Sequence, residues 1–431
     1  MAHHGRGFIT PAAQRRGMDI SQERLREDIE ANAAFGAVDA AEGRGRTLLT
    51  GSDTDRQARE RFVDRLGDAG LDVRVDAVGN VAGRWAPPGC DPDAAPVAFG
   101  SHLDSVPRGG IFDGPLGTYA ALEGVRAMQD AGVTPDRPIE VVSFTEEEGA
   151  RFGIGTLGSS VAGGHRDAAD ALALTDDEGV TLRERLDAIG FHGDDEIDPE
   201  TWDAWVELHI EQGTRLTEAG ADVGVVEAIT GITNCEVEIA GEADHAGSTP
   251  MYERTDALTA GAEFVLDVER AAEEVAAGRE SAVATVGQGT IEPNARNIVP
   301  GTVRYQLDLR DTDTGTMDRL VDRCRSSLAR LERTEGVDTD LDRYRASPPT
   351  PMADRCLGAA DDAAAVRDAD AIRLHSAAVH DTANLAGATD VGLLFAPSVD
   401  GASHSPREWT DWDDCATAAG VLAETVRTLA T

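Results

Sequence analysis

Lysine is absent from the 431-residue sequence, so all 39 basic residues are arginine, and they are set against 79 acidic residues. The net charge of −40 argues against nucleic acid or an anionic membrane as a partner, because both would be repelled. The acidic residues are spread along the chain and are not gathered into a tail. We therefore favour adaptation to high salt, which screens such repulsion, over an acidic surface for one protein partner. A halophilic protein whose stability needs salt is expected.

Cysteine is sparse, and long apolar runs are missing. The five cysteines are scattered without a CxxC pair, which favours reduced, buried thiols over a disulfide framework or a sulfur-ligated zinc. No apolar run approaches the ~20 residues that span a bilayer, and the first residues lack the apolar segment of a signal peptide. These features predict a cytoplasmic protein. Residues 1–17 are expected to form a disordered extension, with Met18 as an alternative start.

The order of apolar and polar segments predicts an α/β fold class with two domains. A buried strand over residues 96–100, a helix over 119–132 and a second strand over 137–145 form a βαβ unit with parallel strands. Ligands bind at the carboxyl ends of such strands, and segments rich in histidine and carboxylates follow both of them. We assign residues 18–227 and 344–431 to this catalytic, metal-binding sheet domain.

Between these two parts the pattern changes to β-α-β-β-α-β. A long alanine-rich helix is predicted around residues 255–278, and another at 315–332. Strands and helices in this order form a small two-layer α+β domain. We place it as an insertion at residues 228–343.

The stretch "SHLDSVPRGGIFDG", residues 101–114, gathers polar groups directly after a predicted buried strand. His102 and Asp104 are two residues apart, so they face the same side of an extended chain. Asp113 follows a glycine turn that can fold it back toward His102. A carboxylate beside a metal-binding imidazole is a common supporting arrangement.

More polar groups lie at other predicted strand ends. Glu146, Glu147 and Glu148 repel one another, and a divalent cation would relieve that repulsion. His209 and His404 lie in two further segments of this kind. Ligation by His, Asp and Glu suits zinc, manganese or cobalt, and paired metals are common in hydrolases. Spacing alone leaves a metal site and separate, structural histidines as open alternatives, and Glu146 is interpreted as a solvated or supporting residue.

Six segments in succession resemble the signatures of one family. They are "GSHLDSVPRGGIFDGPLGTYAALE", "FTEEEGARFGIGTLGSS", "ELHIEQG", "GEADHAGSTPMYERTDAL", "EPNARNIVPGTVRYQLDLR" and "PSVDGASHSPREW". They are similar to the amidase, hydantoinase and carbamoylase family of the M20 metallopeptidase-like superfamily. That family includes N-carbamoyl-L-amino acid hydrolases, β-ureidopropionases and allantoate amidohydrolases. The resemblance covers nearly the whole chain.

The resemblance implies a site for two divalent metal ions, Zn²⁺ or Mn²⁺, with Co²⁺ or Ni²⁺ as alternatives. His102 and His209 would bind the first metal, while Glu148 and His404 would bind the second. Asp113 would bridge both.

The resemblance also implies roles for groups beside the metals. Glu147 would be the general base that takes a proton from water and passes it to the leaving nitrogen. Asp104 would orient His102, and Gln212 would contact the substrate.

The inserted domain resembles the lid and dimerisation domain of the family. His245 would polarise the substrate carbonyl once the lid closes, and Asn297 and Arg310 would hold the substrate carboxylate, some of them across a homodimer. From the residues alone, an ordinary ion-pair arginine at Arg310 and a turn-shaping role for Asn297 stay open as the less favoured alternatives. His380 would bind substrate, but its segment "HSAAVHDTA" (375–383) has larger residues where the family has glycine, and backbone there lies close to substrate.

The implied reaction is hydrolysis of the linear amide or ureido C–N bond of a small carboxylate substrate. The first candidate is an N-carbamoyl-L-amino acid, which would yield the amino acid, ammonia and carbon dioxide. Allantoate amidohydrolase and β-ureidopropionase activities are the nearest alternatives. An M20 aminoacylase or dipeptidase, and a binding protein without catalysis, are more distant ones.

Overall fold

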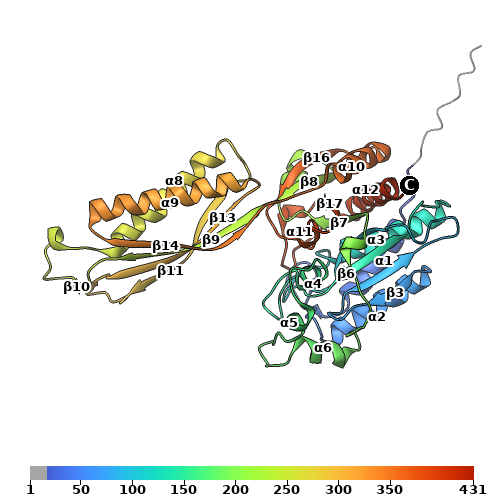
Figure 1. Ribbon diagram of the computed structural model, residues 1–431, viewed down its shortest axis with the longest axis horizontal. Helices are drawn as coiled ribbons and strands as arrows, with labels where there is room; N and C mark the ends of the chain where they lie inside the picture. Colours follow the sequence, from blue (N-terminus) through green and yellow to red (C-terminus); the bar gives the residue numbers. More distant parts are fainter. Residues whose placement is uncertain (1–16) are drawn as a thin grey trace, which may run out of the picture. The chain divides into compact units, whose positions relative to one another are not determined.

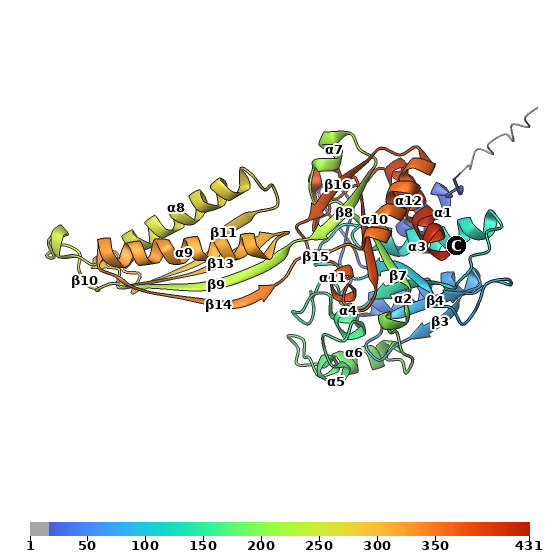
Figure 2. The same ribbon diagram turned by 45° about the horizontal axis from the view of Figure 1, so that its top comes forward.

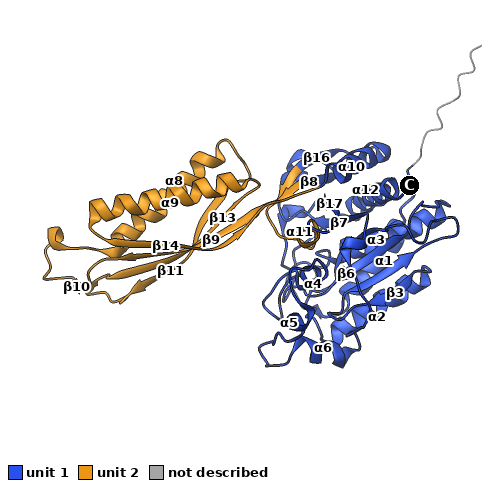
Figure 3. Ribbon diagram, viewed as in Figure 1, with its two compact units in different colours: residues 1–225, 353–373, 387–431 blue, residues 226–352, 374–386 orange. Residues whose placement is uncertain are grey.

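The computed structural model describes residues 17–431, which divide into two compact units (Figure 1, Figure 3). Unit 1 contains the residues up to Val225 with Ala353–Arg373 and Gly387–Thr431, and unit 2 contains Val226–Met352 and Leu374–Ala386. The predicted N-terminal extension lies outside the described residues, apart from Gly17. Within 17–431, no helix is both long enough and apolar enough to cross a membrane.

The larger sheet has nine strands in the order β15-β8-β17-β7-β5-β6-β4-β3, with β16 paired to β8. The four strands β17, β7, β5 and β6 are parallel and belong to unit 1, while β4 and β3 continue the sheet in antiparallel pairing. The strands are β3 (Asp72–Val75), β4 (Val81–Trp85), β5 (Val97–His102), β6 (Ile139–Phe144), β7 (Ala204–Ile210), β8 (Val223–Ile229), β15 (Thr350–Pro351), β16 (Ala371–Ser376) and β17 (Asp390–Ala396).

Helices of unit 1 pack against the parallel strands of the sheet. Helices α3 and α12 contact β5 and β7 (Figure 2). Helix α1 packs against both α3 and α12, and α10 packs against α12. Helix α2 contacts β3 and β4. Every residue of β5, β6 and β7 is buried, as expected for parallel strands covered on two sides. The helices are α1 (Gln22–Ala33), α2 (Asp53–Asp68), α3 (Pro115–Asp130), α10 (Asp354–Arg367) and α12 (Trp412–Ala430).

Short elements connect these layers. They are β1 (Ala37–Val38), β2 (Gly45–Arg46), α4 (Leu157–Ala162), α5 (Ala168–Leu172), α6 (Leu182–Ile189), η1 (Pro199–Thr201), α7 (Arg215–Ala219) and η3 (Val399–Gly401).

The predicted βαβ unit is present as β5, α3 and β6. Strands β5 and β6 pair in parallel, with Val97 opposite Ile139 and His102 opposite Phe144. Helix α3 begins at Pro115, earlier than the sequence predicts. The reason is local, because a proline is well suited to the first position of a helix, where its missing N–H removes no bond.

Unit 2 contains a four-stranded antiparallel sheet in the order β11-β13-β9-β14. Helices α8 and α9 pack on one face of this sheet (Figure 1). The main elements are β9 (Gly231–Ala240), α8 (Ala257–Ala276), β11 (Val283–Glu292), β13 (Thr302–Asp311), α9 (Thr314–Glu335) and β14 (Asp338–Ser347). The short ones are β10 (Asp244–His245), η2 (Met251–Glu253), β12 (Ile298–Val299) and α11 (Thr382–Leu385).

The chain order of these elements is the predicted β-α-β-β-α-β order. The core of unit 2 joins Phe264 of α8 and Leu328 of α9 to Val237 and Leu307 of the sheet, and all four are buried. The two units together confirm the predicted mixed α/β fold class.

Candidate metal centre

The carboxyl ends of three neighbouring parallel strands bring the predicted polar groups together. His102 is the last residue of β5, and His209 lies near the end of β7. In the β5–β7 pairing Gly100 is opposite Glu207, so the two histidines, each two residues further on, reach the same level. The glutamate segment follows the end of β6 at Phe144.

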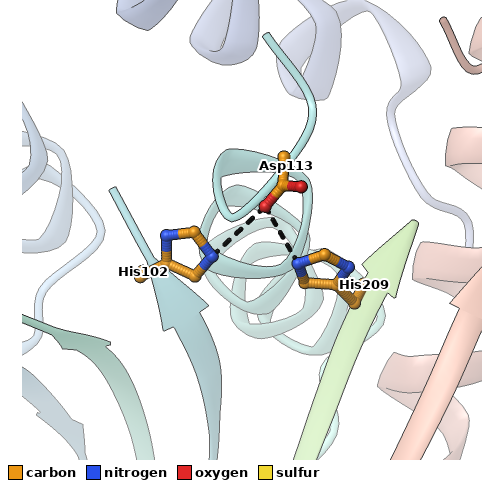
Figure 4. Close-up of side chains that lie close together, drawn as sticks. All are labelled: His102, Asp113 and His209. Carbon is orange, nitrogen blue, oxygen red and sulfur yellow. Dashed lines mark hydrogen bonds and ion pairs between the residues drawn. The ribbon is translucent and has the colours of Figure 1, made fainter. Parts of the chain in front are cut away.

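His102, Asp113 and His209 form a buried group (Figure 4). Asp113 Oδ1 lies 3.4 Å from His102 Nε2 and 3.1 Å from His209 Nε2. Nδ1 of His209 lies 2.9 Å from the carbonyl oxygen of Ile210. If Nδ1 donates to that carbonyl, the ring directs the lone pair of Nε2 toward Asp113, as a metal ligand requires.

Asp113 also belongs to a second group, with Glu148 and His404. His404 Nε2 lies 3.2 Å from Glu148 Oε2 and 3.7 Å from Asp113 Oδ2. The side chain of His404 is 51% exposed, whereas those of Glu148 and Asp113 are 5% exposed. One carboxylate thus turns one oxygen to each group, as a bridging ligand does.

Asp104 contacts residues of both groups. Its two carboxylate oxygens accept the backbone N–H groups of Glu147 and Glu148, at 3.2 and 3.1 Å. Its Oδ1 lies 3.5 Å from His102 Nδ1. Glu147 Oε2 in turn lies 3.6 Å from His102 Nε2, so the predicted base stands beside the first group.

The donor atoms fit divalent cations. They are imidazole nitrogens and carboxylate oxygens, which suit zinc and manganese. His102 Nε2 is buried and has no hydrogen-bond partner among the described residues, although a buried polar atom is normally satisfied. A cation between His102, His209 and Asp113 would supply the missing partner.

The pKa values of the buried group show strong mutual interaction. Burial opposes protonation of His209, but the Asp113 carboxylate outweighs it and raises the pKa of His209 to about 9. Burial would raise the pKa of Asp113, yet His209 and His102 hold that pKa well below its usual range. Protons thus compete with a cation for these nitrogens.

Gly114 allows the loop to bring Asp113 close to His102. Its φ is +80°, a conformation that favours glycine. A Cβ atom here would lie 2.5 Å from two atoms of the His102 ring. Any side chain would therefore push the imidazole away from its place.

Glu146 is buried, and backbone amides hold its carboxylate. Its Oε1 accepts the backbone N–H groups of Arg151 and Phe152, both at 2.7 Å. Burial, followed by the charge of Asp104, raises its pKa to about 7. Glu146 belongs to neither ligand group. Of the two roles expected from the sequence, solvated or supporting, its burial and its hydrogen bonds fit the supporting one.

Gln212 lies beside Asp113, as a substrate-contacting residue at the centre would. Its Nε2 donates to Asp113 Oδ2 at 3.2 Å and to Ser403 Oγ at 3.1 Å. Ser403 donates to the same Asp113 oxygen at 2.8 Å. These two side chains fix the carboxylate plane of Asp113.

The remaining predicted site residues belong to unit 2. Within it, β10 pairs with β12, and the carbonyl oxygen of Asn297 accepts the N–H of Ala246 at 3.0 Å, so the segments of His245 and Asn297 are neighbours. Nδ1 of His245 accepts two backbone N–H groups, from Gly247 at 3.0 Å and Ser248 at 3.1 Å.

Arg310 makes an ion pair and also contacts the atypical segment 375–383. Its Nε lies 2.7 Å from Asp308 Oδ1, and its Nη1 donates to the carbonyl oxygen of Ala377 at 2.8 Å. In the same segment His380 is buried, with Nε2 2.9 Å from Ser376 Oγ.

The sequence analysis missed Arg46, Ser403 and Glu408. All three contact the loop that carries Asp113. Glu408 and Ser403 lie within "PSVDGASHSPREW", one of the six family-like segments, which was a usable signal. Arg46 is one arginine among 39 and stands in no recognisable pattern.

Comparison with known proteins defines the class. Residues 98–428 match the model of Peptidase family M20/M25/M40, and the chain therefore belongs to this family of hydrolases. Within it, the chain resembles a hydantoinase/carbamoylase family amidase from Burkholderia ambifaria, whose crystal structure superposes with a TM-score of 0.89 at 38% identity. That match covers 96% of this chain and 99% of the other.

Two sequence relatives have more specific names. The chain is 39% identical to an N-carbamoyl-L-amino acid amidohydrolase from Geobacillus stearothermophilus, over 92% of this chain and 96% of the relative. It is 34% identical to a ureidoglycolate hydrolase from Oryza sativa, over 88% of this chain and 79% of the relative. The resemblance stated from the sequence motifs is confirmed.

Proposed function

We propose that the protein hydrolyses the linear amide or ureido C–N bond of a small carboxylate substrate, with an N-carbamoyl-L-amino acid as the first candidate. The observation that carries the proposal is Asp113, which is shared by two groups of candidate metal ligands. Cation pairs held in this way are common in hydrolases. The name of the Geobacillus relative supports the substrate. The products would be the amino acid, ammonia and carbon dioxide.

His102 and His209 would hold one divalent cation, Glu148 and His404 the other, and Asp113 both. Zn²⁺ and Mn²⁺ are the first candidates, and Co²⁺ or Ni²⁺ would also suit these donors. When bound, the cations supply Lewis acidity, which polarises the substrate carbonyl and makes water a stronger acid.

Glu147 would move the protons of the reaction. It lies beside His102, where it can take a proton from the attacking water and deliver it to the leaving nitrogen. Asp104 would keep Glu147 in place, because it accepts the Glu147 backbone N–H. Gln212, next to Asp113, would contact the substrate beside the cations.

The residues of unit 2 would bind and orient the substrate. Because Nδ1 of His245 accepts two N–H groups, its proton belongs on Nε2, which can donate to the substrate carbonyl oxygen. The planar guanidinium of Arg310 can bind the substrate carboxylate through two parallel hydrogen bonds. To do so it would have to release its ion pair with Asp308. Asn297 and His380 are further candidates for contacts with the substrate.

The domain roles follow the same reasoning. We assign residues 18–227 and 344–431 to the catalytic domain and 228–343 to a lid that also dimerises; unit 2 is larger than this lid, because it extends to Met352 and includes Leu374–Ala386 with His380. Strand β11 supports the proposed dimerisation, because it is an edge strand and Val283 in it is 47% exposed. Leu266 of α8, on the same unit, is 46% exposed. A homodimer in a salt-rich cytoplasm is the proposed working state.

Ammonia release tests the proposal. The purified chain is assayed in molar salt with Zn²⁺ or Mn²⁺ against N-carbamoyl-L-amino acids, N-carbamoyl-β-alanine, allantoate and ureidoglycolate, with Glu147→Gln as control. Release from a ureido substrate that falls by about 10²- to 10⁴-fold in the variant would support it. A folded, metal-loaded protein that releases ammonia from none of them would refute it.

A second candidate is the hydrolysis of ureidoglycolate or a related ureido acid. The rice relative favours it, and the larger residues of segment 375–383 would change the shape of a substrate pocket built on the family pattern. The same assay separates the two, because each substrate is measured alone. An N-acetyl amino acid, followed by release of the free amino acid, tests the acylase alternative.

A further inference from the structure

The loop from Leu103 to Asp113 is held by a fully buried arginine. Arg46 Nη1 donates to the carbonyl oxygen of Leu103 at 2.8 Å, and Nε donates to that of Gly110 at 3.1 Å. Its Nη2 donates to the carbonyls of Asp104 and Asp113, at 3.1 and 3.2 Å. One guanidinium therefore ties together both ends of the loop.

A buried glutamate holds the same loop by its amides. Glu408 Oε1 accepts the backbone N–H of Phe112 at 2.8 Å and that of Asp113 at 3.0 Å. Gly110 leaves room for it, because a Cβ atom there would lie 2.1 Å from the Glu408 carboxylate. Arg46 and Glu408 are 0% and 1% exposed.

Two buried opposite charges would ordinarily pair with each other. Among the described residues, no ion pair joins Arg46 to Glu408 within 4.0 Å, and each charge is directed at the backbone. Burying a charge is costly unless its hydrogen bonds are satisfied. The chain carries this cost at the one loop that bears both Asp104 and Asp113.

We propose that Arg46 and Glu408 are positioning residues. They fix the loop so that Asp104 and Asp113 are held in the geometry that binding of two cations requires. Arg46 fixes the carbonyls on both sides of the loop, and Glu408 fixes the amides just before the bridging carboxylate. This inference rests on the proposed function, because it concerns the same metal centre.

Two variants of Glu408 separate hydrogen bonding from charge. Glu408→Gln keeps an oxygen that can accept both amides, whereas Glu408→Ala removes it. Arg46→Met keeps the length of the side chain but removes all donors, and Arg46→Lys restores some of them. Arg126→Met is the matched control, because Arg126 of α3 is also buried but pairs with Asp28 of α1, away from the loop.

Co²⁺ binding to the full-length protein is the main readout, measured by titration of the visible spectrum in molar salt. Groups that orient metal ligands typically contribute about 10- to 100-fold in affinity. We expect a loss of that size, with a changed spectrum, in Glu408→Ala and Arg46→Met. Glu408→Gln should bind like the wild type, and Arg46→Lys should be intermediate. Turnover should show a lower kcat with a nearly unchanged KM.

Wild-type Co²⁺ affinity and spectrum in folded Glu408→Ala would overturn the inference, as would a loss no greater than that of Arg126→Met. An equal loss in Glu408→Gln would also overturn it, because charge and not hydrogen bonding would then matter. If Arg46→Met does not fold, the Glu408 pair still decides. Failure of the wild type itself to bind two cations would instead refute the proposed function.

Discussion

A single carboxylate, Asp113, connects most of the polar contacts at the centre. It faces His102, His209 and His404, and it receives hydrogen bonds from Gln212 and Ser403. Removing its charge should therefore affect both ligand groups at once. Removing a residue from one group should leave the other largely intact.

Asp113→Asn should abolish tight binding of both cations, whereas His404→Ala should abolish only one, because His404 belongs to the second group alone. Metal content after dialysis, determined by elemental analysis, provides the test. Circular dichroism on both variants checks that they are folded. Equal metal content in the two variants would contradict the shared role of Asp113.

The cysteines make a separate prediction at the residue scale. Cys235, Cys324, Cys356 and Cys415 are buried, and Cys90 is partly exposed. Burial raises the pKa of Cys324 and Cys356 to about 12, so these thiols stay protonated and unreactive. A thiol reagent at pH 8 should label one cysteine per native chain and five after unfolding.

Cys90→Ser is the control for that experiment. In this variant the native protein should not be labelled, and the unfolded protein should be labelled at the four remaining cysteines. Rapid labelling of several thiols in the native protein would show that the core opens easily.

Sequence reasoning reached some of these residues and not others, for physical reasons. His102 and Asp113 lie in one short motif, so spacing and resemblance point to them directly. The four backbone contacts of Arg46 depend on how a distant loop folds, and no local pattern encodes them. Arg310 is an intermediate case: its ion pair with Asp308, two residues away on the same strand, fits the ion-pair alternative, whereas its hydrogen bond to the distant Ala377 carbonyl has no local signal.

At the scale of elements, buried ion pairs join the helices of unit 1. Asp28 of α1 is buried and pairs with Arg126 of α3 at 2.7 Å and with Arg61 and Arg65 of α2, both at 2.9 Å. One carboxylate thus connects three helices that are distant in sequence. The βαβ pattern was readable from apolar spacing, but this three-way connection was not, because it depends on packing.

Asp28→Asn should lower the free energy of unfolding by about 3 kcal/mol, because buried Arg126 loses its nearer carboxylate partner and keeps only Glu123 at 3.7 Å. Chemical denaturation in molar salt measures this. Asp130→Asn serves as the control: Asp130 also pairs with an arginine, but its side chain is 62% exposed, and exposed pairs contribute about 0–1 kcal/mol. Similar losses in both variants would contradict the importance of burial.

At the scale of the whole molecule, charge dominates. A net charge of −40 destabilises a compact chain by self-repulsion, and salt relieves that repulsion by screening it. The melting temperature should therefore rise steeply as KCl increases from about 0.1 M, where the screening length is about 10 Å, toward 1 M, where it is about 3 Å. Differential scanning calorimetry measures the shift.

Sucrose is the matched control for that experiment, because it favours the compact state without screening charge. A rise with sucrose as large as that with KCl would show that general exclusion, and not repulsion, limits stability.

The unequal exposure of the two ligand groups has a kinetic consequence. His102, Asp113 and His209 are all buried, whereas His404 is half exposed. A cation in the outer position should therefore exchange with solvent much faster than one in the inner position. Brief chelation followed by addition of a different metal should then yield a heterobimetallic protein, in which the inner and outer metals can be chosen separately.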